Sequence, residues 1–482
     1  MDSTNRASTH GAHHVRPLRL AAAGLSFALL AATLAGAAIA EPSSAPPPVA
    51  SGCLPTATTP VTQPTQAQLD VAGLGDLQLA PDSARRDLSA APFSDPTSIT
   101  NPLFPISSLH SAILNGHVDG KVFHTETTLL PFTRIVEWTP GQCVRTLVSQ
   151  YMAFLGGRLQ ETAIDLYAQA DDGSVWYLGE TVSDYARDGL ILTTEGTWQA
   201  GIDGPFAMIM PSDPQIGDVN RAENIPGNSF EEVEVTQVDQ TFAGPSGPVS
   251  GGIVARETHQ DAAPSDKLFA PGYGEFRSTD GPDVEAMALA SPTDSLPGGV
   301  PEELAAISNG ADRIYASPLA SPTQWARAAT VAQRMIEAWD AFRTGDVPPR
   351  LVKPTSIALR GLAARIASHR RSKTYLASIG AAYASNDLQL RYRPVSAIDT
   401  MRFALWVRRA LVDAKDGSLG GVRSDAVTLE WTRDRIAHTL DPVTLTRLDT
   451  LVGALGSAVF DHDLGGAVES AQDLQDVMTR LV

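Results

Sequence analysis

The stretch Asp165–Asp218 reads DLYAQADDGSVWYLGETVSDYARDGLILTTEGTWQAGIDGPFAMIMPSDPQIGD and decides the fold of the chain's middle part. Short runs of β-branched and aromatic residues alternate with Asp-Gly pairs, where glycine accepts the positive φ of a tight hairpin turn. No segment of helical length and period interrupts the region. Because parallel strands need such crossovers, the stretch predicts an antiparallel sheet.

The same pattern continues on both sides of this stretch, whereas the last third of the chain has a helical period. Strands are predicted at 121–130, 142–151, 174–182, 229–238 and 251–259. After residue 322, apolar residues recur every three or four positions and predict six or seven helices. The fold class is therefore α+β and multidomain, with an antiparallel β-meander or half-barrel followed by an α-helical bundle.

Composition divides the 482 residues into five segments. We predict a signal peptide at 1–40 and a disordered Pro/Ser/Thr-rich spacer at 41–97, because such composition buries too little apolar surface to fold. The β domain follows at 98–290. A second Pro/Gly/Ser-rich stretch at 291–321 reads as a linker to the helical bundle at 322–482.

The N-terminus has the features of an export signal. Arg6, Arg16 and Arg19 precede an uncharged run that ends in the small-x-small site Ala38-Ile39-Ala40. The expected location is outside the cytoplasm, either secreted or in the cell envelope. An uncleaved membrane anchor is the alternative, because about 20 apolar residues can span a bilayer.

The formal net charge of −18 bears on the class of partner. An acidic surface repels nucleic acid phosphates and anionic lipid headgroups. We therefore expect no nucleic acid partner, and no integral membrane association after the signal is removed.

The chain contains two cysteines, Cys53 and Cys143. Export to an oxidising compartment permits one disulfide between them, which would tether the N-terminal segment to the β domain. Lipidation of Cys53 is the alternative, although a polar stretch separates it from the apolar run.

The motifs of the β domain resemble a known group of proteins. The stretch DLYAQADDGSVWYLGE at 165–180 and EGTWQAGIDG at 195–204 are similar to sequences of an uncharacterised family of secreted bacterial β-rich proteins. The resemblance covers about 100–277 and implies an extracytoplasmic β domain without an assigned activity. The helical part resembles modules appended to exported proteins.

Acidic residues crowd one predicted hairpin. Asp165, Asp172 and Glu180 are weak candidates for a catalytic carboxylate pair that hydrolyses a glycosidic bond. Asp171, Asp172 and Glu180 are weak candidates for calcium ligands. The alternative is that Asp171 and Asp172 only initiate a turn, because Asp-Gly pairs do so on chemical grounds alone.

Large apolar side chains gather in the same region. Trp176, Trp198 and Met208 are candidates for lining a ligand site in the concavity of a curved sheet. The alternative is that they fill an ordinary sheet core.

Other chemistry has little support in the sequence. The chain lacks HExxH, paired CxxC, GxSxG and phosphate-loop patterns, so no metal site or cofactor is predicted. The arginines between Arg391 and Arg409 are expected to form ion pairs with acidic residues of the bundle.

These patterns favour a non-catalytic binding or envelope-associated protein with an apolar or carbohydrate-like ligand on its β domain. A carboxylate-dependent hydrolase of envelope polymers and a structural cell-surface module are the alternatives.

Overall fold

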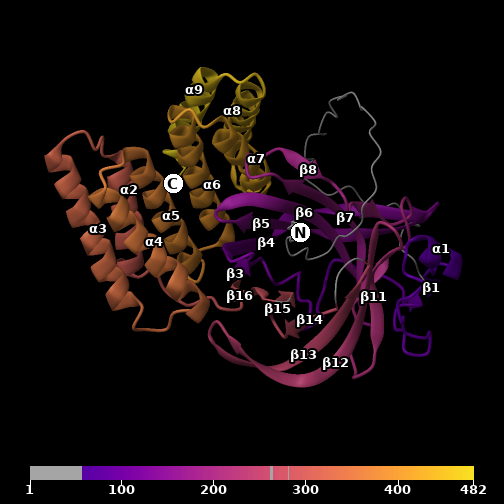
Figure 1. The fold of residues 1–482 in the computed structure, drawn as a ribbon. Coiled ribbons are helices and arrows are strands. Elements are labelled where there is room, and N and C mark those ends of the chain that lie inside the picture. Colours follow the sequence, from indigo (N-terminus) through magenta and orange to yellow (C-terminus); the bar gives the residue numbers. More distant parts are fainter. Residues whose placement is uncertain (1–56, 261–263, 281, 482) are drawn as a thin grey trace, which may run out of the picture.

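The computed structural model describes residues 57–260, 264–280 and 282–481. The predicted signal peptide and Cys53 lie outside this range. The chain forms a strongly curved antiparallel sheet followed by a layer of helices, as the sequence pattern predicts (Figure 1).

Fourteen strands of the described residues make the main sheet. They are β3 (Ser111–Val118), β4 (Lys121–Thr139), β5 (Gln142–Leu155), β6 (Arg158–Gln169), β7 (Val175–Tyr185), β8 (Ile191–Thr193), β9 (Trp198–Gln199), β10 (Ala207–Met210), β11 (Val219–Ile225), β12 (Ser229–Gly244), β13 (Gly247–His259), β14 (Ser265–Ala270), β15 (Gly274–Asp280) and β16 (Asp283–Ser291). The strand order is β10-β7-β6-β5-β4-β3-β16-β15-β14-β13-β12-β11, with β8 and β9 also paired to β7.

The sheet curves until its two ends meet. β10 and β11 form these ends, and the Asn220 side chain on β11 donates a 2.8 Å hydrogen bond to the Met208 carbonyl on β10. The result is a nearly closed barrel, in which successive residues of each strand point alternately inward and outward. The inward-pointing side chains line the cavity described below.

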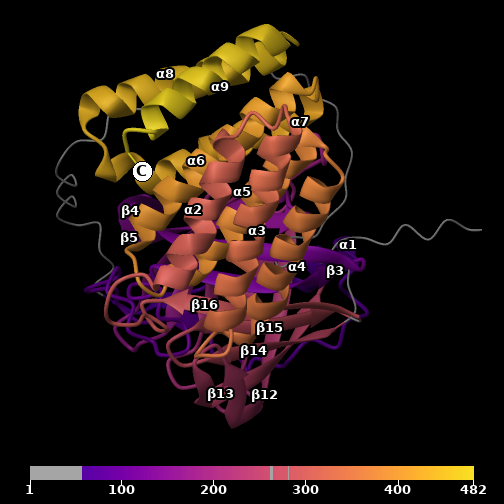
Figure 2. The same ribbon diagram turned by 90° about the vertical axis from the view of Figure 1, so that its left-hand side faces the viewer.

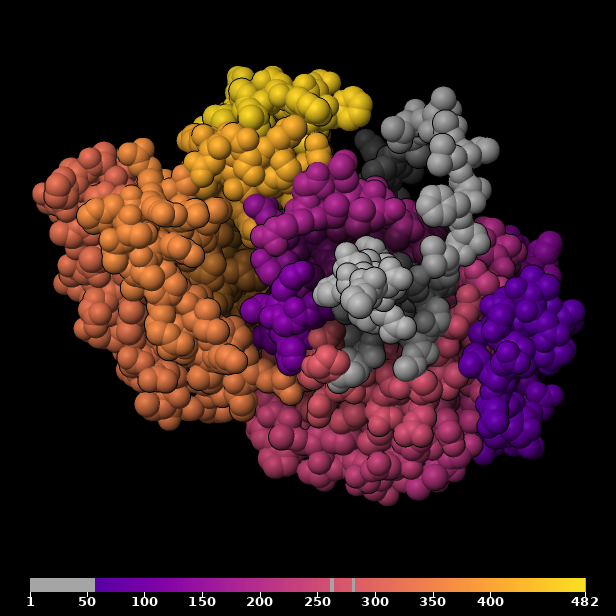
Figure 3. All heavy atoms as spheres, viewed as in Figure 1, coloured from indigo at the N-terminus to yellow at the C-terminus, as the bar shows by residue number. Residues whose placement is uncertain are grey.

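The segment 57–97 is folded against the outside of the barrel, so the prediction of a disordered spacer is wrong for these residues. It contains β1 (Thr59–Pro60), α1 (Gln66–Val71) and β2 (Ser89–Ala90), and lies beside β11 in Figure 1. Figure 3 shows this indigo segment against the side of the barrel. Phe93 is buried, with its ring 6.5 Å from that of Phe206. Arg86 pairs with Asp218 of the barrel at 2.5 Å. Buried apolar side chains such as Phe93 therefore fold this segment against the barrel, although its overall composition is polar.

Eight α-helices and a 3₁₀ turn make the described C-terminal part (Figure 2). They are α2 (Glu302–Ala316), α3 (Pro322–Phe342), α4 (Pro349–Ala367), α5 (Arg371–Gln389), α6 (Val395–Lys415), α7 (Leu419–Ile436), η1 (Ala437–Thr439), α8 (Pro442–Phe460) and α9 (Leu464–Met478). The helix α2 lies inside the segment predicted as a linker, and that prediction is wrong there: Leu304 and Ile307 are fully buried in the bundle.

By length and composition alone, α8 is the one helix among the described residues that could cross a membrane. Such a test is weak, because a helix of a soluble bundle passes it too. Leu448 and Leu455 of α8 are fully buried in the apolar core that α8 shares with α6, α7 and α9.

The helices α6 and α7 pack on the outer face of the barrel. The ring of Phe154 on β5 stacks on Trp406 of α6 with centroids 5.5 Å apart. The turn at Gly189 lies against α7 so closely that a Cβ atom would be 2.6 Å from the Ser424 nitrogen. Gly189 also has a φ of +79°, so glycine is required there on both counts.

Candidate functional site

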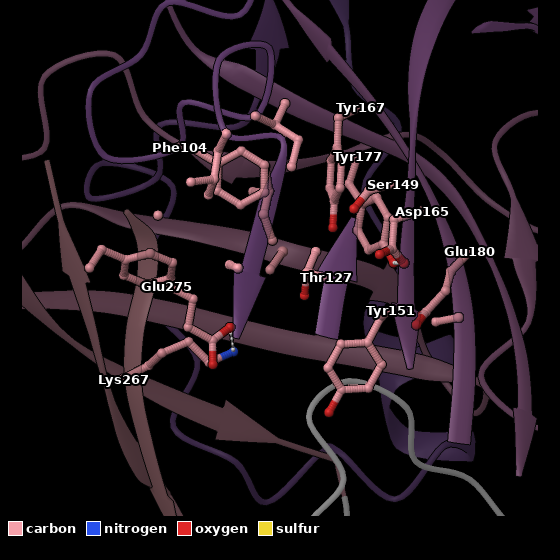
Figure 4. A pocket seen from close by; sticks show the side chains of 18 of the residues that line it. Phe104, Thr127, Ser149, Tyr151, Asp165, Tyr167, Tyr177, Glu180, Lys267 and Glu275 are labelled. Carbon is pink, nitrogen blue, oxygen red and sulfur yellow. Dashed lines mark hydrogen bonds and ion pairs between the residues drawn. The ribbon is translucent and has the colours of Figure 1, made fainter. Parts of the chain in front are cut away.

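The interior of the barrel contains a cavity of about 170 Å³ that is rich in carboxyl groups (Figure 4). Eight acidic side chains from the seven strands β6, β7, β11, β12, β13, β15 and β16 line it: Glu161, Asp165, Glu180, Glu223, Glu231, Glu257, Glu275 and Glu285. Lys267 is the one cationic side chain among the described residues that line it. The site therefore has a large excess of acidic groups.

The other part of the wall is apolar. Phe104, Ile106, Leu109, Leu114 and Phe269 line it, and the first three come from the loop before β3. A cavity with an acidic part and an apolar part suits a ligand that has both a charged and an apolar end.

Asp165 on β6 and Glu180 on β7 form one acidic pair. The two residues lie directly opposite each other in the antiparallel register. The Tyr177 hydroxyl donates a 2.8 Å hydrogen bond to Asp165 Oδ1, and these side chains lie together in Figure 4. Burial raises the pKa of Asp165 to about 7, although the Tyr177 hydrogen bond opposes the rise. Burial, followed by repulsion from Asp165, raises the pKa of Glu180 well above its ordinary value.

Glu223 and Glu285 also hold protons more tightly than ordinary carboxyl groups. Burial and the neighbouring Glu231 raise the pKa of Glu223 to about 8. Burial and Glu275 raise the pKa of Glu285 to about 8, while a hydrogen bond from the Thr125 hydroxyl opposes the change. Near neutral pH these groups are therefore mainly protonated when the cavity holds no cation.

Lys267 on β14 partly neutralises the acidic side chains on the side of the cavity that faces Asp165. Its Nζ atom lies 2.6 Å from Glu257 Oε1 and 3.8 Å from Glu275 Oε2. Burial lowers the pKa of Lys267, but Glu257 and Glu275 outweigh it and the pKa lies well above its ordinary value. Burial likewise raises the pKa of Glu231, but Lys267 and His259 outweigh it and lower this pKa. Figure 4 shows Lys267 and Glu275 across the open space from Asp165.

Three acidic side chains remain incompletely satisfied. Glu180 Oε2, Glu223 Oε1 and Glu285 Oε2 are buried and accept no hydrogen bond from an N–H or hydroxyl donor of the described residues. Glu223 and Glu180 interact with each other, and this interaction opposes the rise in the pKa of Glu223. All three residues line the cavity. A buried polar atom without a partner costs about 1–3 kcal/mol, so each is a position at which a bound donor would stabilise the protein.

Two groups of the described residues bring potential metal ligands within 4.8 Å of one another. In the barrel they are Glu231, Glu257 and His259, but Lys267 already supplies a positive charge to Glu257. The other group is His124, Glu126 and Asp387, between barrel and bundle. There Arg435 pairs with Glu126 at 2.5 Å and Arg402 with Asp387 at 2.7 Å, so guanidinium groups occupy the place of a metal cation.

The structure separates the acidic residues that the sequence grouped together. Asp165 and Glu180 meet in the cavity, whereas Asp171 and Asp172 lie on the exposed turn between β6 and β7. Asp171 accepts hydrogen bonds from Ser94, and Asp172 accepts them from Ser174. Neither the three catalytic candidates nor the three calcium candidates form a single site, because Asp172 belongs to the turn.

The aromatic candidates lie in the core and do not line the cavity. Trp176, Trp198 and Met208 are at most 3% exposed. The ring of Trp176 contacts Phe206 edge-on at 5.2 Å, and its Nε1 donates to Ser174 Oγ. Trp176 neighbours the inward-facing Tyr177 in β7, so it points out of the barrel.

Cys143 is buried in β5 and is disulfide-bonded. Cys53 lies outside the described residues.

Most residues of the cavity were missed from the sequence. Glu223, Glu231, Glu257, Lys267 and Glu285 lie on strands distant in the chain from Asp165. The available signal was alternation, but it covers only Glu231 and Glu257, which stand at inward positions of the predicted strands 229–238 and 251–259. Glu223, Lys267 and Glu285 lie outside the predicted strands. Glutamates at outward positions, such as Glu232 and Glu234, obscured the alternation.

Comparison with known proteins gives no family for the chain. No protein-family model matches it, and a search of curated proteins found no similar sequence.

Proposed function

We propose that the β domain is a binding module that holds a small organic cation with an apolar body inside the barrel. The observation that carries the proposal is the set of three buried, unpartnered carboxyl oxygens of Glu180, Glu223 and Glu285 around a cavity with an apolar wall. From the sequence we expect an apolar or carbohydrate-like ligand. The acidic cavity makes this proposal more specific, because the ligand must also carry an amine.

The energetic argument rests on the cost of burying charge. An ionised carboxylate without a counter-charge is strongly disfavoured in a protein interior, so it either binds a proton or pairs with a cation. Lys267 supplies one positive charge for eight acidic side chains. A bound ammonium would replace protons on this cluster and donate charge-assisted hydrogen bonds to its free oxygens.

The cavity volume limits the ligand. An engineered apolar cavity of about 150 Å³ in another protein binds benzene, and this cavity has about 170 Å³. A single ring or a short chain with one amine is of suitable size. The net charge of −18 also attracts cations toward the protein.

An extracytoplasmic location remains part of the proposal through the export signal predicted at 1–40. A binding module outside the cell would capture such amines from the surroundings. We favour binding over a purely structural module because three such oxygens line one cavity that also has an apolar wall.

Benzylamine is a suitable probe, and benzyl alcohol is its uncharged control. In titration calorimetry of the mature protein, we expect saturable benzylamine binding and at least about tenfold weaker binding of benzyl alcohol. Binding should strengthen from about pH 6 to about pH 8, because protons must leave groups such as Asp165, with a pKa of about 7, before the ammonium pairs with them.

A double variant tests which residues bind the probe. Glu180→Gln/Glu223→Gln should lose benzylamine binding, because neutral amides no longer balance the ammonium. The control is Glu234→Gln, since Glu234 is exposed on β12. Equal affinity for benzyl alcohol and benzylamine, or unchanged binding by the double variant, would contradict the proposal.

The hydrolase remains the second candidate function. The observation in its favour is the Asp165–Glu180 pair, in which Asp165 has a pKa of about 7 that suits a general acid near neutral pH. The test is turnover of a panel of chromogenic glycosides. Loss of turnover in Asp165→Asn would support hydrolysis, and undiminished turnover in Asp165→Asn/Glu180→Gln would exclude it.

A further inference from the structure

A second cavity, of about 580 Å³, lies between the barrel and the helices and differs from the first in charge. Its volume is within the range of about 300–1,000 Å³ that is typical of small-molecule sites. Five side chains that are cationic or can become so line it: His110, Arg391, Arg393, Arg435 and His438. Asp399 is the one carboxylate among the described residues that line it. We call this cavity the interdomain cleft.

Arg435 on α7 lines the interdomain cleft and has one side-chain nitrogen without a partner. Its side chain is fully buried. Nε lies 2.5 Å from Gln150 Oε1, and Nη1 lies 2.5 Å from Glu126 Oε2. Nη2 is buried and has no hydrogen-bond partner among the described residues. The two bonds fix the guanidinium plane, so an oxyanion in the cleft would meet a donor already held in position.

The first turn of α6 supplies backbone donors to the same cleft. Val395 and Ser396 line the cleft and are the first two residues of this 21-residue helix. The helix has no side-chain cap at its N-cap, Pro394. Its first backbone hydrogen bonds begin at the amides of Ala397 and Ile398, so the two preceding N–H groups have no acceptor within the helix. A helix N-terminus with free N–H groups attracts anions.

The remaining arginines have separate roles. Arg391 is buried and holds the wall, since its guanidinium donates to the backbone oxygens of Asp294 and Asp346. Arg393 is exposed at the rim, and no hydrogen bond or ion pair of its side chain occurs within the described chain. Arg393 therefore differs from the sequence expectation that these arginines form ion pairs. His438 is exposed at the same rim.

Asp399 offsets part of this positive charge, because its Oδ1 lies 3.7 Å from Arg435 Nη1. This oxygen also lies 3.4 Å from Arg402 Nη1, and the Asp399 Oδ2 is buried without a partner among the described residues. Burial raises the pKa of Asp399, although Arg435 and Arg402 oppose the rise.

We propose that the interdomain cleft binds a small molecule through an oxyanion group, phosphate or carboxylate, held by Arg435 Nη2, the first N–H groups of α6 and Arg393. The site is separate from the barrel cavity, and its ligand is an anion whereas the ligand proposed for the barrel is a cation. Because Arg435 and α6 belong to the bundle and Thr128 and Leu129 of β4 also line the cleft, a bound oxyanion would contact both parts of the protein.

Titration calorimetry of the mature protein tests the proposal with inorganic phosphate and with succinate as probes, and with chloride at equal ionic strength as the blank. We expect saturable binding of at least one probe. Arg393→Gln/His438→Gln removes two exposed rim groups and should weaken binding by about tenfold. Arg360→Gln is the matched control, because Arg360 is exposed on α4 away from the cleft.

If phosphate binds more tightly than succinate, the ligand is a phosphorylated molecule. If succinate binds more tightly, the ligand is a carboxylic acid. Either result supports an oxyanion site. The proposal is overturned if neither probe saturates above chloride, or if the rim variant binds as tightly as the control. Benzylamine binding should be the same in the rim variant and the wild type, so this test does not depend on the proposed function of the barrel.

Discussion

Replacing Glu223 by Gln should make the protein more stable at high pH. The side chain is buried on β11 and its pKa is about 8, compared with about 4.3 for Glu in an unfolded chain. Between these two pH values the folded state keeps a proton that the unfolded state releases. The free energy of unfolding of the wild type therefore falls as the pH rises through this window. Gln has no proton to release and removes this contribution.

The magnitude follows from the two pKa values. One pKa unit corresponds to about 1.36 kcal/mol, so an isolated group would contribute at most about 5 kcal/mol over the window. Glu223 shares its environment with Glu231, and protons of interacting carboxyl groups belong to the pair. We therefore expect the variant to gain between about 2 and about 5 kcal/mol relative to wild type from about pH 5 to about pH 9.

The assay is urea unfolding at several pH values in amine-free buffer, followed by tryptophan fluorescence, because Trp176 and Trp198 are buried in the β domain. Glu234→Gln is the control and should give a curve parallel to that of the wild type. If the stability of Glu223→Gln also runs parallel to the wild type at every pH, Glu223 is not a buried group with a raised pKa and the account of the cavity is wrong.

Three further predictions concern how the parts of the protein are joined. Arg435→Met leaves the buried Glu126 without one of its partners and should lower the free energy of unfolding by about 3–5 kcal/mol. The control Arg433→Met removes a partly exposed pair with Asp449 and should lower it by less than about 1 kcal/mol. Equal losses of the two variants in chemical denaturation would contradict the interface described here. Phe93→Ala should destabilise the protein by about 3–5 kcal/mol and expose residues 57–97 to limited proteolysis, and unchanged cleavage would show that this segment does not depend on its apolar anchor. Leu304→Ala should lower the unfolding free energy by about 2–5 kcal/mol, and a loss near zero would mean that α2 is not part of the bundle core.

The sequence predicted the antiparallel sheet and the helices because both depend on local patterns. Asp-Gly turns mark the hairpin between β6 and β7, and apolar residues recur every three or four positions along helices such as α3. The errors occurred where a few apolar residues outweigh a polar composition, as Phe93 does in the first segment and Leu304 does in the second.

The cavity could be predicted only in part. Asp165 and Glu180 were candidates because a single hairpin brings them together. Their association with Glu223 and Glu285 depends on the closure of the sheet between β10 and β11, which no local pattern specifies. The interdomain cleft was missed for the same reason, since Arg435 and Val395 meet the barrel only through the packing of the helices.

The most direct test of the central claim is a crystal structure of the protein with benzylamine. We predict the ring against Phe104 and Phe269, and the ammonium within about 3 Å of carboxyl oxygens of Glu180 or Glu223, the usual length of a charge-assisted hydrogen bond. A barrel that contains only water at saturating benzylamine, or benzylamine bound only elsewhere, would contradict the account.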